Sequence, residues 1–299
     1  MTFEYFSDRE NGKTENTIEV ISESVWNGIV SVYKKLIHNN NLSYNFPYQC
    51  NDGLGIYACN EKALEHSIKA EIPNLLIPIQ EFQYYSDKYP DTYDVLDFLE
   101  FLYKNITDVT QNNYHSFFKH YHLSFHENGL SKKQFIENIN LLLNRNRIIF
   151  YLDINGKIQR TIPSSLKIIV DGIRQKSEDH RLNELFEMAY SKIILPRPLQ
   201  RLEGLERLWD CFERLKTYYN EINKKKSAEA LIDHICGNNI LFKKYMNSEF
   251  TTLTEIGNNF QIRHFERDKT QITENHHIDY LFYRMSCLIN LCLNKINKS

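Results

Sequence analysis

Residues that break helices are scarce in this chain. Among 299 residues there are only 10 glycines and 7 prolines. Glycine and proline are the strongest local signals of turns and loops. So few of them predict long helices with few loops, and no internal repeat or low-complexity segment is present.

Paired cysteines and long apolar runs are also missing. None of the six cysteines belongs to a CxxC pair, and no stretch of about 18 apolar residues is found. The first residues, MTFEYFSDRENGK, are charged and contain no apolar core. A transmembrane helix and a secretory signal are therefore not expected. We expect a cytoplasmic protein with reduced thiols that does not contact a membrane.

Charge of one sign is not in excess. Lysine and arginine number 36 against 38 acidic residues, which gives a formal net charge of −2. No overall field would draw the protein to nucleic acid, so any such binding depends on a local patch. A hydrophobic content of 42% and a charged content of 25% are those of an ordinary globular protein.

Most of the sequence has the apolar periodicity of helices. Apolar residues recur at three- and four-residue steps, and turn residues separate the periodic stretches. The helices predicted in this way cover residues 17–38, 62–70, 93–105, 130–146 (with Ser131 as the cap), 182–195, 204–219, 250–266 and 277–294, with one more beginning near Ser227.

One β-hairpin interrupts this pattern. The run IIFYLDINGKIQRTI, residues 148–162, has two β-rich halves around a turn at residues 153–156. We therefore predict a mainly α fold in two parts. Residues 1–165 form an N-terminal helical domain with a small β-hairpin, with a sensor or regulatory role. Residues 166–299 form a C-terminal helical bundle.

Charged residues gather in the stretch QIRHFERDK, residues 261–269. Arg263 has the planar guanidinium that matches phosphate oxygens, and His264 titrates near neutral pH and can transfer a proton. Arg263 and Glu266 are also three positions apart, the spacing of an ordinary helical ion pair. A phosphate-handling site and a solvated surface both fit these residues.

The chain resembles the AbiJ-like abortive-infection proteins of bacteria, whose C-terminal part belongs to the HEPN superfamily. In the C-terminal half the resemblance is carried by LEGLERLWDCFERLKTYY, KKKSAEALI, LTEIGNNFQIRHFE and IDYLFYRMSCLINLCL. In the N-terminal half it is carried by YFSDRENG, VWNGIV, IPNLLIPI, YHSFFKHYHLSF and NGKIQR. The segments are spread over nearly the whole chain.

The resemblance implies a HEPN-like bundle that forms a homodimer and cleaves RNA, either tRNA or mRNA, without a metal or other cofactor. In such domains an arginine stabilises the phosphate while the RNA 2′-hydroxyl attacks, and a histidine transfers a proton. Four to six residues usually separate the two, whereas Arg263 and His264 are adjacent here. An inhibitor or activator protein is a further expected partner.

The residues expected to act in this way fall into three groups. The catalytic group is Arg263, His264 and Glu266; the RNA- and phosphate-binding group is Lys216, Arg267, Lys269 and Arg284; the supporting group is Asp210, Glu213 and Asn258. The alternative is a non-catalytic HEPN-like module that binds a nucleic acid, a nucleotide or a protein partner.

A histidine-rich stretch occupies residues 115–126. If it is a strand, His120, His122 and His126 share one face. His120 and His122 are then candidates to bind one metal ion, with His115 from a neighbouring turn. Apart from Glu127, no Cys, Asp or Glu stands nearby at ligand spacing, so hydrogen bonding and packing are the simpler interpretation.

Overall fold

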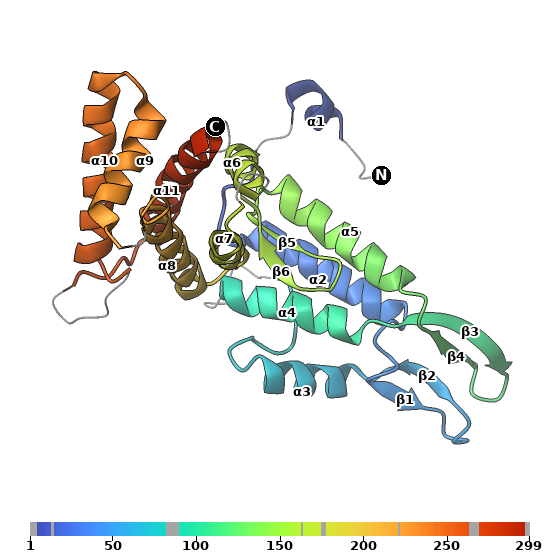
Figure 1. Cartoon of the computed structure of the whole chain (residues 1–299). Coiled ribbons are helices and arrows are strands. Elements are labelled where there is room, and N and C mark those ends of the chain that lie inside the picture. The colour runs from blue at the N-terminus through green and yellow to red at the C-terminus, as the bar shows by residue number, and fades with distance from the viewer. Residues whose placement is uncertain are drawn as a thin grey trace. The chain divides into compact units, whose positions relative to one another are not determined.

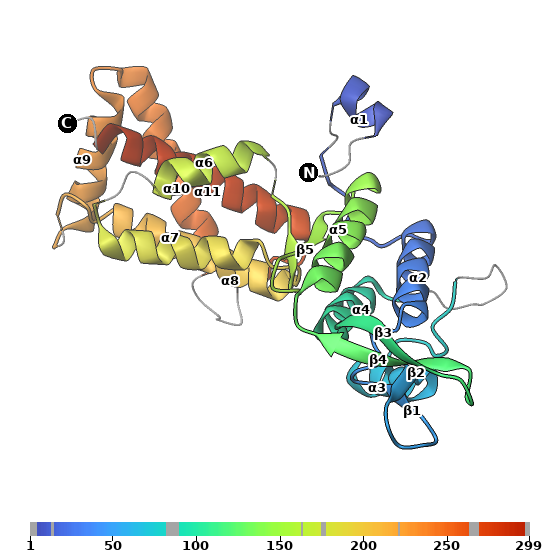
Figure 2. The ribbon, with the colours of Figure 1, turned by 90° about the vertical axis from the view of Figure 1, so that its right-hand side faces the viewer.

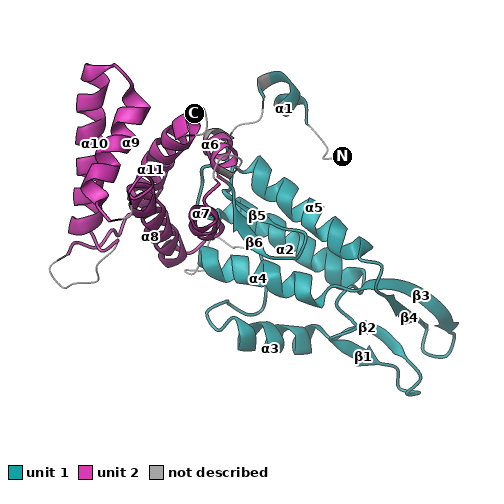
Figure 3. Cartoon of the chain, viewed as in Figure 1, with its two compact units in different colours: residues 1–161 teal, residues 162–299 magenta. Residues whose placement is uncertain are grey.

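A computed structural model describes residues 5–12, 15–81, 90–162, 164–174, 178–220, 222–262 and 269–296. The chain divides into two compact units, Met1–Thr161 (unit 1) and Ile162–Ser299 (unit 2) (Figure 3). The described residues form a mainly α fold with small two-stranded sheets, which confirms the predicted fold class.

Unit 1 contains helices and three antiparallel hairpins (Figure 1). Its helices are α1 (Phe6–Asn11), α2 (Glu23–His38), α3 (Glu61–Glu71), α4 (Thr92–Asn105) and α5 (Leu130–Arg145). Its hairpins pair β1 (Pro47–Gln49) with β2 (Ile56–Cys59), β3 (Asp108–His115) with β4 (His120–His126), and β5 (Phe150–Leu152) with β6 (Ile158–Arg160).

The core of unit 1 lies between α2, α4 and α5 and extends to β5 and β6. Val25 and Ile29 of α2 are fully buried, and the ring of Tyr33 meets Phe98 of α4 edge to face with centroids 5.5 Å apart. Helix α2 begins later than predicted, because Ile18 is in extended backbone paired with Ile148.

The predicted hairpin at residues 148–162 is confirmed, and its turn is held by Asp153. Phe150 pairs with Arg160 and Leu152 with Ile158. The Asp153 carboxylate accepts hydrogen bonds from the backbone N–H groups of Asn155 and Lys157, both at 2.8 Å. Turns of this kind favour aspartate because its side chain bonds to the backbone that follows.

Helix α5 is capped by a residue that is distant in sequence. Ser131 was expected to be the N-cap, but that position belongs to Gly129, at a φ of 73°. The cap oxygens come from Asp108 at the start of β3, which accepts from the N–H groups of Leu130 (3.1 Å) and Ser131 (2.6 Å). A carboxylate at a helix N-terminus satisfies free N–H groups and the helix dipole, so β3 and α5 are joined at this point.

All the described elements of unit 2 are helices. They are α6 (Ser164–Arg174), α7 (His180–Ile193), α8 (Pro198–Leu215), α9 (Lys224–Cys236), α10 (Ile240–Asn259) and α11 (Asn275–Ile296). Helix α8 contacts α7 and α11, while α9 and α10 lie side by side (Figures 1 and 2). Among the described residues, none of the helices combines the length and the apolar character that a bilayer crossing requires.

Helix α10 differs from its prediction at both ends. It begins at Ile240, capped by the side chain of Asn239, and ends at Asn259. The predicted end at residue 266 is wrong, because Phe260 is already in extended backbone. Phe260 forms a parallel β-bridge with Thr270.

Helices α8 and α10 approach closely at one glycine. Trp209 of α8 is fully buried, and a Cβ placed on Gly257 of α10 would lie 2.1 Å from its Nε1 atom. Only a residue without a side chain fits there. The indole therefore fills the space that a side chain at position 257 would need.

We predict that Gly257→Ala destabilises unit 2 by about 1–3 kcal/mol, the usual range for overpacking a core. Helix propensity alone would favour alanine by about 0.5–1 kcal/mol, so the two effects have opposite signs. Urea unfolding in a Trp26→Phe background would measure the change in the free energy of unfolding, because tryptophan fluorescence then reports on Trp209 alone.

Ser248→Ala is the matched control, since Ser248 is on the exposed side of the same helix. If Gly257→Ala proved as stable as this control, the close approach of α8 and α10 would not limit the packing.

Candidate functional site

The expected catalytic stretch lies between α10 and α11. Arg263, His264, Glu266 and Arg267 fall outside the described residues, so the structure does not place them. The backbone on either side is paired: Gln261 N–H donates to Thr270 O at 3.0 Å, and Thr270 N–H donates to Asn259 O at 3.2 Å. The chain therefore leaves α10 and returns toward α11 at one place, close to the half-buried Lys269.

Lys216 and Glu213 come together at the C-terminal end of α8. Lys216 is 6% exposed; its Nζ lies 2.7 Å from Glu213 Oε1 and donates to Thr254 Oγ1 of α10 at 3.1 Å. Glu213 also pairs with Lys224 at the start of α9. Glu213 is therefore shared by two lysines, one of which, Lys216, also bonds to α10.

Glu213 is ionised at neutral pH in this setting. Burial favours its neutral form, but hydrogen bonds from Lys216 and Lys224 outweigh burial and hold the pKa of Glu213 below its usual value.

Arg284 of α11 is engaged by Glu249 of α10. Its Nε and Nη2 atoms donate to the two carboxylate oxygens at 2.8 and 2.7 Å, a bidentate arrangement. These hydrogen bonds raise the pKa of Arg284 above its ordinary value. Glu249 and Thr254 are five residues apart, about 140° around a helix. Arg284 and Lys216 thus bind different sides of α10.

The other predicted supporting residues are at the surface. Asp210 accepts from Arg207 one turn earlier on α8 at 3.0 Å, and both side chains are more than 40% exposed. Asn258 is exposed in the last turn of α10. Neither residue joins the group around Glu213.

Near the start of α11 the structure reveals a buried charge that the sequence analysis missed. Arg201 of α8 is 1% exposed; it forms an ion pair with Asp279 and donates to Asn275 O at 3.3 Å. The sequence does indicate this burial, because Arg201 precedes Leu205 by one helical turn and so lies on the apolar side of α8.

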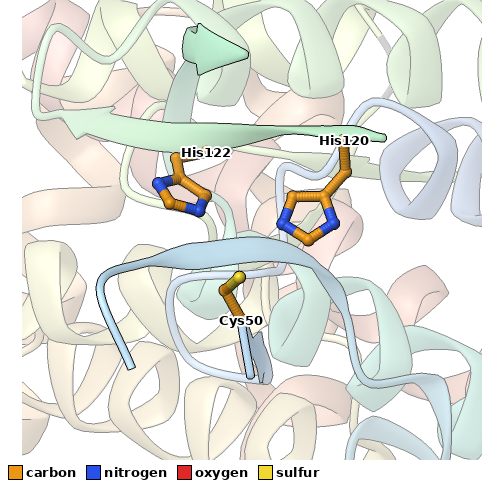
Figure 4. A group of neighbouring side chains, drawn as sticks. All are labelled: Cys50, His120 and His122. Carbon is orange, nitrogen blue, oxygen red and sulfur yellow. The ribbon is translucent and has the colours of Figure 1, made fainter. Parts of the chain in front are cut away.

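Histidines of β3 and β4 meet residues from the β1–β2 connection. His120 and His122, the candidates for metal binding, face Cys50 (Figure 4). Asp52 lies 2.8 Å from His115, measured between Oδ2 and Nε2. Sequence analysis missed Cys50 and Asp52, which are more than 60 residues from the histidines and share no ligand spacing with them.

We predict that Glu213→Gln lowers the free energy of unfolding of unit 2 by about 1–3 kcal/mol at neutral pH, because it leaves a buried lysine without its carboxylate. A carboxyl whose pKa is lowered by folding stabilises the fold above its ordinary pKa, about 4.3, and loses this effect as the pH falls through its folded value. The difference between the two proteins should therefore shrink below about pH 4.

Urea unfolding from neutral pH down to about pH 3 measures this difference. Asp210→Asn is the control, because it breaks an exposed i,i+3 pair on the same helix and should cost less than about 1 kcal/mol. A pH-independent difference for Glu213→Gln would show that charge is not the cause.

The family model AbiJ N-terminal domain 4 matches residues 4–173, which is more than half of the chain. The match spans the described part of unit 1 and continues into α6. No curated protein and no solved structure matches. The chain belongs to the AbiJ N-terminal domain 4 family, which places it in the context of abortive infection, a form of phage defence.

Proposed function

We propose that this chain is an abortive-infection effector that cleaves RNA with its C-terminal unit. Three findings support the proposal: the family of the N-terminal part, the helical character of the described part of unit 2, and the position of the Arg263–His264 stretch between two of its helices. The last of these carries most weight, because the paired backbone at residues 259–261 and 270 holds both ends of that stretch on the bundle.

In the proposed reaction the RNA supplies its own nucleophile. The 2′-oxygen forms a bond to phosphorus, and the bond from phosphorus to the 5′-oxygen of the next nucleotide breaks. His264 transfers the proton between these oxygens, and Arg263 stabilises the negative charge on the phosphate. The products are a 2′,3′-cyclic phosphate and a 5′-hydroxyl, so the chemistry calls for no cofactor.

The remaining charged residues take two kinds of role in this proposal. Arg267 and Lys269 bind the RNA backbone, and Glu266 orients a catalytic side chain. Lys216 and Arg284 are already paired with carboxylates inside the bundle. They would contact phosphate only by giving up those partners, so we assign them to holding α10 in place, Lys216 beside Glu213 and Arg284 on Glu249.

A homodimer is part of the proposal. Neighbouring residues point about 100° apart on a helix and to opposite faces on a strand. In a homodimer, one copy would supply Arg263 and the other His264 to the same phosphate. The expected surroundings are the cytoplasm, tRNA or mRNA as substrate, and an inhibitor or activator protein that controls the timing.

A non-catalytic role is the second candidate. Arg263 and His264 depart from the usual spacing of the motif, and the described cations Lys216 and Arg284 are occupied by carboxylates. In that case the HEPN-like bundle binds a nucleic acid, a nucleotide or a protein partner without cutting RNA.

RNA cleavage by the purified chain tests the first candidate. We expect 2′,3′-cyclic phosphate ends, with and without EDTA, and at least a 100-fold loss of rate in Arg263→Ala and His264→Ala, as removal of a proton-transfer or charge-stabilising group usually gives.

Arg181→Ala and His38→Ala are the controls. Arg181 forms an exposed pair with Glu184, and His38 is exposed in the last turn of α2. No cleavage of a broad RNA panel by folded, dimeric protein would favour the binding module. If the control variants lost as much cleavage rate, the catalytic site would not lie at residues 263–264.

A further inference from the structure

Five side chains of unit 1 converge between two hairpins. Cys50 and Asp52 belong to the connection from β1 to β2, His115 ends β3, and His120 and His122 lie on β4. Figure 4 shows both imidazoles of β4 directed toward the sulfur of Cys50. Strand β2 contacts β4, so the two hairpins lie side by side, as Figures 1 and 2 show.

Two groups of possible ligands share Cys50, and Asp52 Oδ2 of the second group lies 4.0 Å from His122 Nε2 of the first. The Cys50, His120 and His122 ligand atoms all lie within 4.8 Å of one another, and so do those of Cys50, Asp52 and His115. Ligand atoms around tetrahedral zinc are about 3.3–3.6 Å apart, given Zn–N and Zn–S bonds of about 2.0 and 2.3 Å. Shifts of about an ångström would therefore close the site.

Buried atoms without partners point to the same place. Within the part of the chain that the structure describes, His120 Nε2, His122 Nε2 and Asp52 Oδ2 are buried and have no hydrogen-bond partner of acceptable geometry. Burying such atoms without a partner destabilises the fold. Asp52 Oδ2 lies 2.8 Å from His115 Nε2 and 4.0 Å from His122 Nε2, and the second distance is too long for a hydrogen bond.

Neighbouring residues fix the orientation of the cluster. The ring of Tyr57 stacks on His120, with centroids 4.3 Å apart and planes 15° apart. Gly55 lies against His122, since a Cβ there would come within 3.0 Å of its ring. Cys50 N–H donates to Gly55 O at 2.7 Å, which closes the loop that carries both Cys50 and Asp52.

His115 is suited to orient Asp52. Its Nδ1 accepts from Phe118 N–H at 3.4 Å, so the proton of a neutral ring is on Nε2, which faces Asp52 Oδ2. Histidine and carboxylate pairs of this kind are the usual support around metal ligands.

The hairpins need such a link. A two-stranded sheet is marginally stable by itself, and no residue of β3 or β4 belongs to the buried apolar core of unit 1. A metal bound by residues of both hairpins would supply the stabilisation that apolar packing supplies elsewhere.

We propose that Cys50, Asp52, His120 and His122 bind one zinc-class ion that fastens the β1–β2 hairpin to the β3–β4 hairpin, with His115 positioning Asp52. The mixed sulfur, nitrogen and oxygen donors suit Zn²⁺, whereas Mg²⁺ and Ca²⁺ prefer oxygen alone. Four protein ligands leave no open position, so the site is structural and independent of the proposed RNA cleavage.

The test is the metal content of the untagged full chain after reconstitution with Zn²⁺ and removal of free metal. We expect about one zinc ion per chain. Cys50→Ser, His120→Ala and His122→Ala should lose it, while His115→Ala should bind about 10–100-fold more weakly. His126→Ala is the matched control, because His126 lies on the same strand but bonds to Thr110 Oγ1.

A spectroscopic experiment keeps the test independent of variant folding. The wild-type chain loaded with Co²⁺ should show tetrahedral ligand-field bands and a thiolate-to-cobalt charge-transfer band, and Cys50→Ser should lose only the latter if it still binds. A folded wild-type chain that binds neither Zn²⁺ nor Co²⁺ would overturn the proposal. Loss of metal in His126→Ala equal to that in His120→Ala would overturn the assignment of ligands.

Discussion

Unit 2 depends on the burial of α8. Trp209, Leu205, Leu208 and Phe212 are all fully buried in this one helix, so neighbouring helices must cover it on several sides. Such complete burial leaves little room for side chains on the facing helices, and Gly257 shows how tightly α10 is fitted to the indole. This packing also limits where charged side chains lie on α8. Glu213, Lys216 and Arg201 lie near the ends of α8, and each is paired there with an opposite charge.

Periodicity in the sequence accounts for much of this arrangement. Helix α4 was predicted within one residue of its true bounds, and the β5–β6 hairpin was predicted from its turn. Helix α8 was predicted at residues 204–219 but spans Pro198–Leu215. Errors came from contacts between residues far apart in the chain. Ser131 has the side chain of a cap, but Asp108 reaches the same N–H groups from another element. The stretch at residues 39–55 is rich in Asn and contains Pro and Gly, so it was interpreted as a break in the chain, although Pro47–Gln49 within it forms β1.

The candidate sites were likewise predicted only in part from the sequence. An arginine and a histidine next to each other are visible in the sequence, and so are histidines at alternate positions. The sequence pattern does not show which distant residue completes each group. Cys50 stands in an irregular stretch with no second ligand at metal spacing, and only the folding of one hairpin against another brings it to His120 and His122. Likewise, the engagement of Arg284 by Glu249 depends on the approach of α10 to α11.

Strand β3 has a further consequence for unit 1. At its first residue, Asp108 holds the N-terminus of α5, and at its last residue, His115 meets Asp52 in the histidine cluster. The seven residue steps from Asp108 to His115 cover about 23 Å of extended backbone, so one strand ties a helix end to a polar cluster well beyond the reach of a direct contact. The β3–β4 hairpin is thus tied at one end to the first turn of α5, the helix that places Phe135, Ile139 and Leu143 in the core.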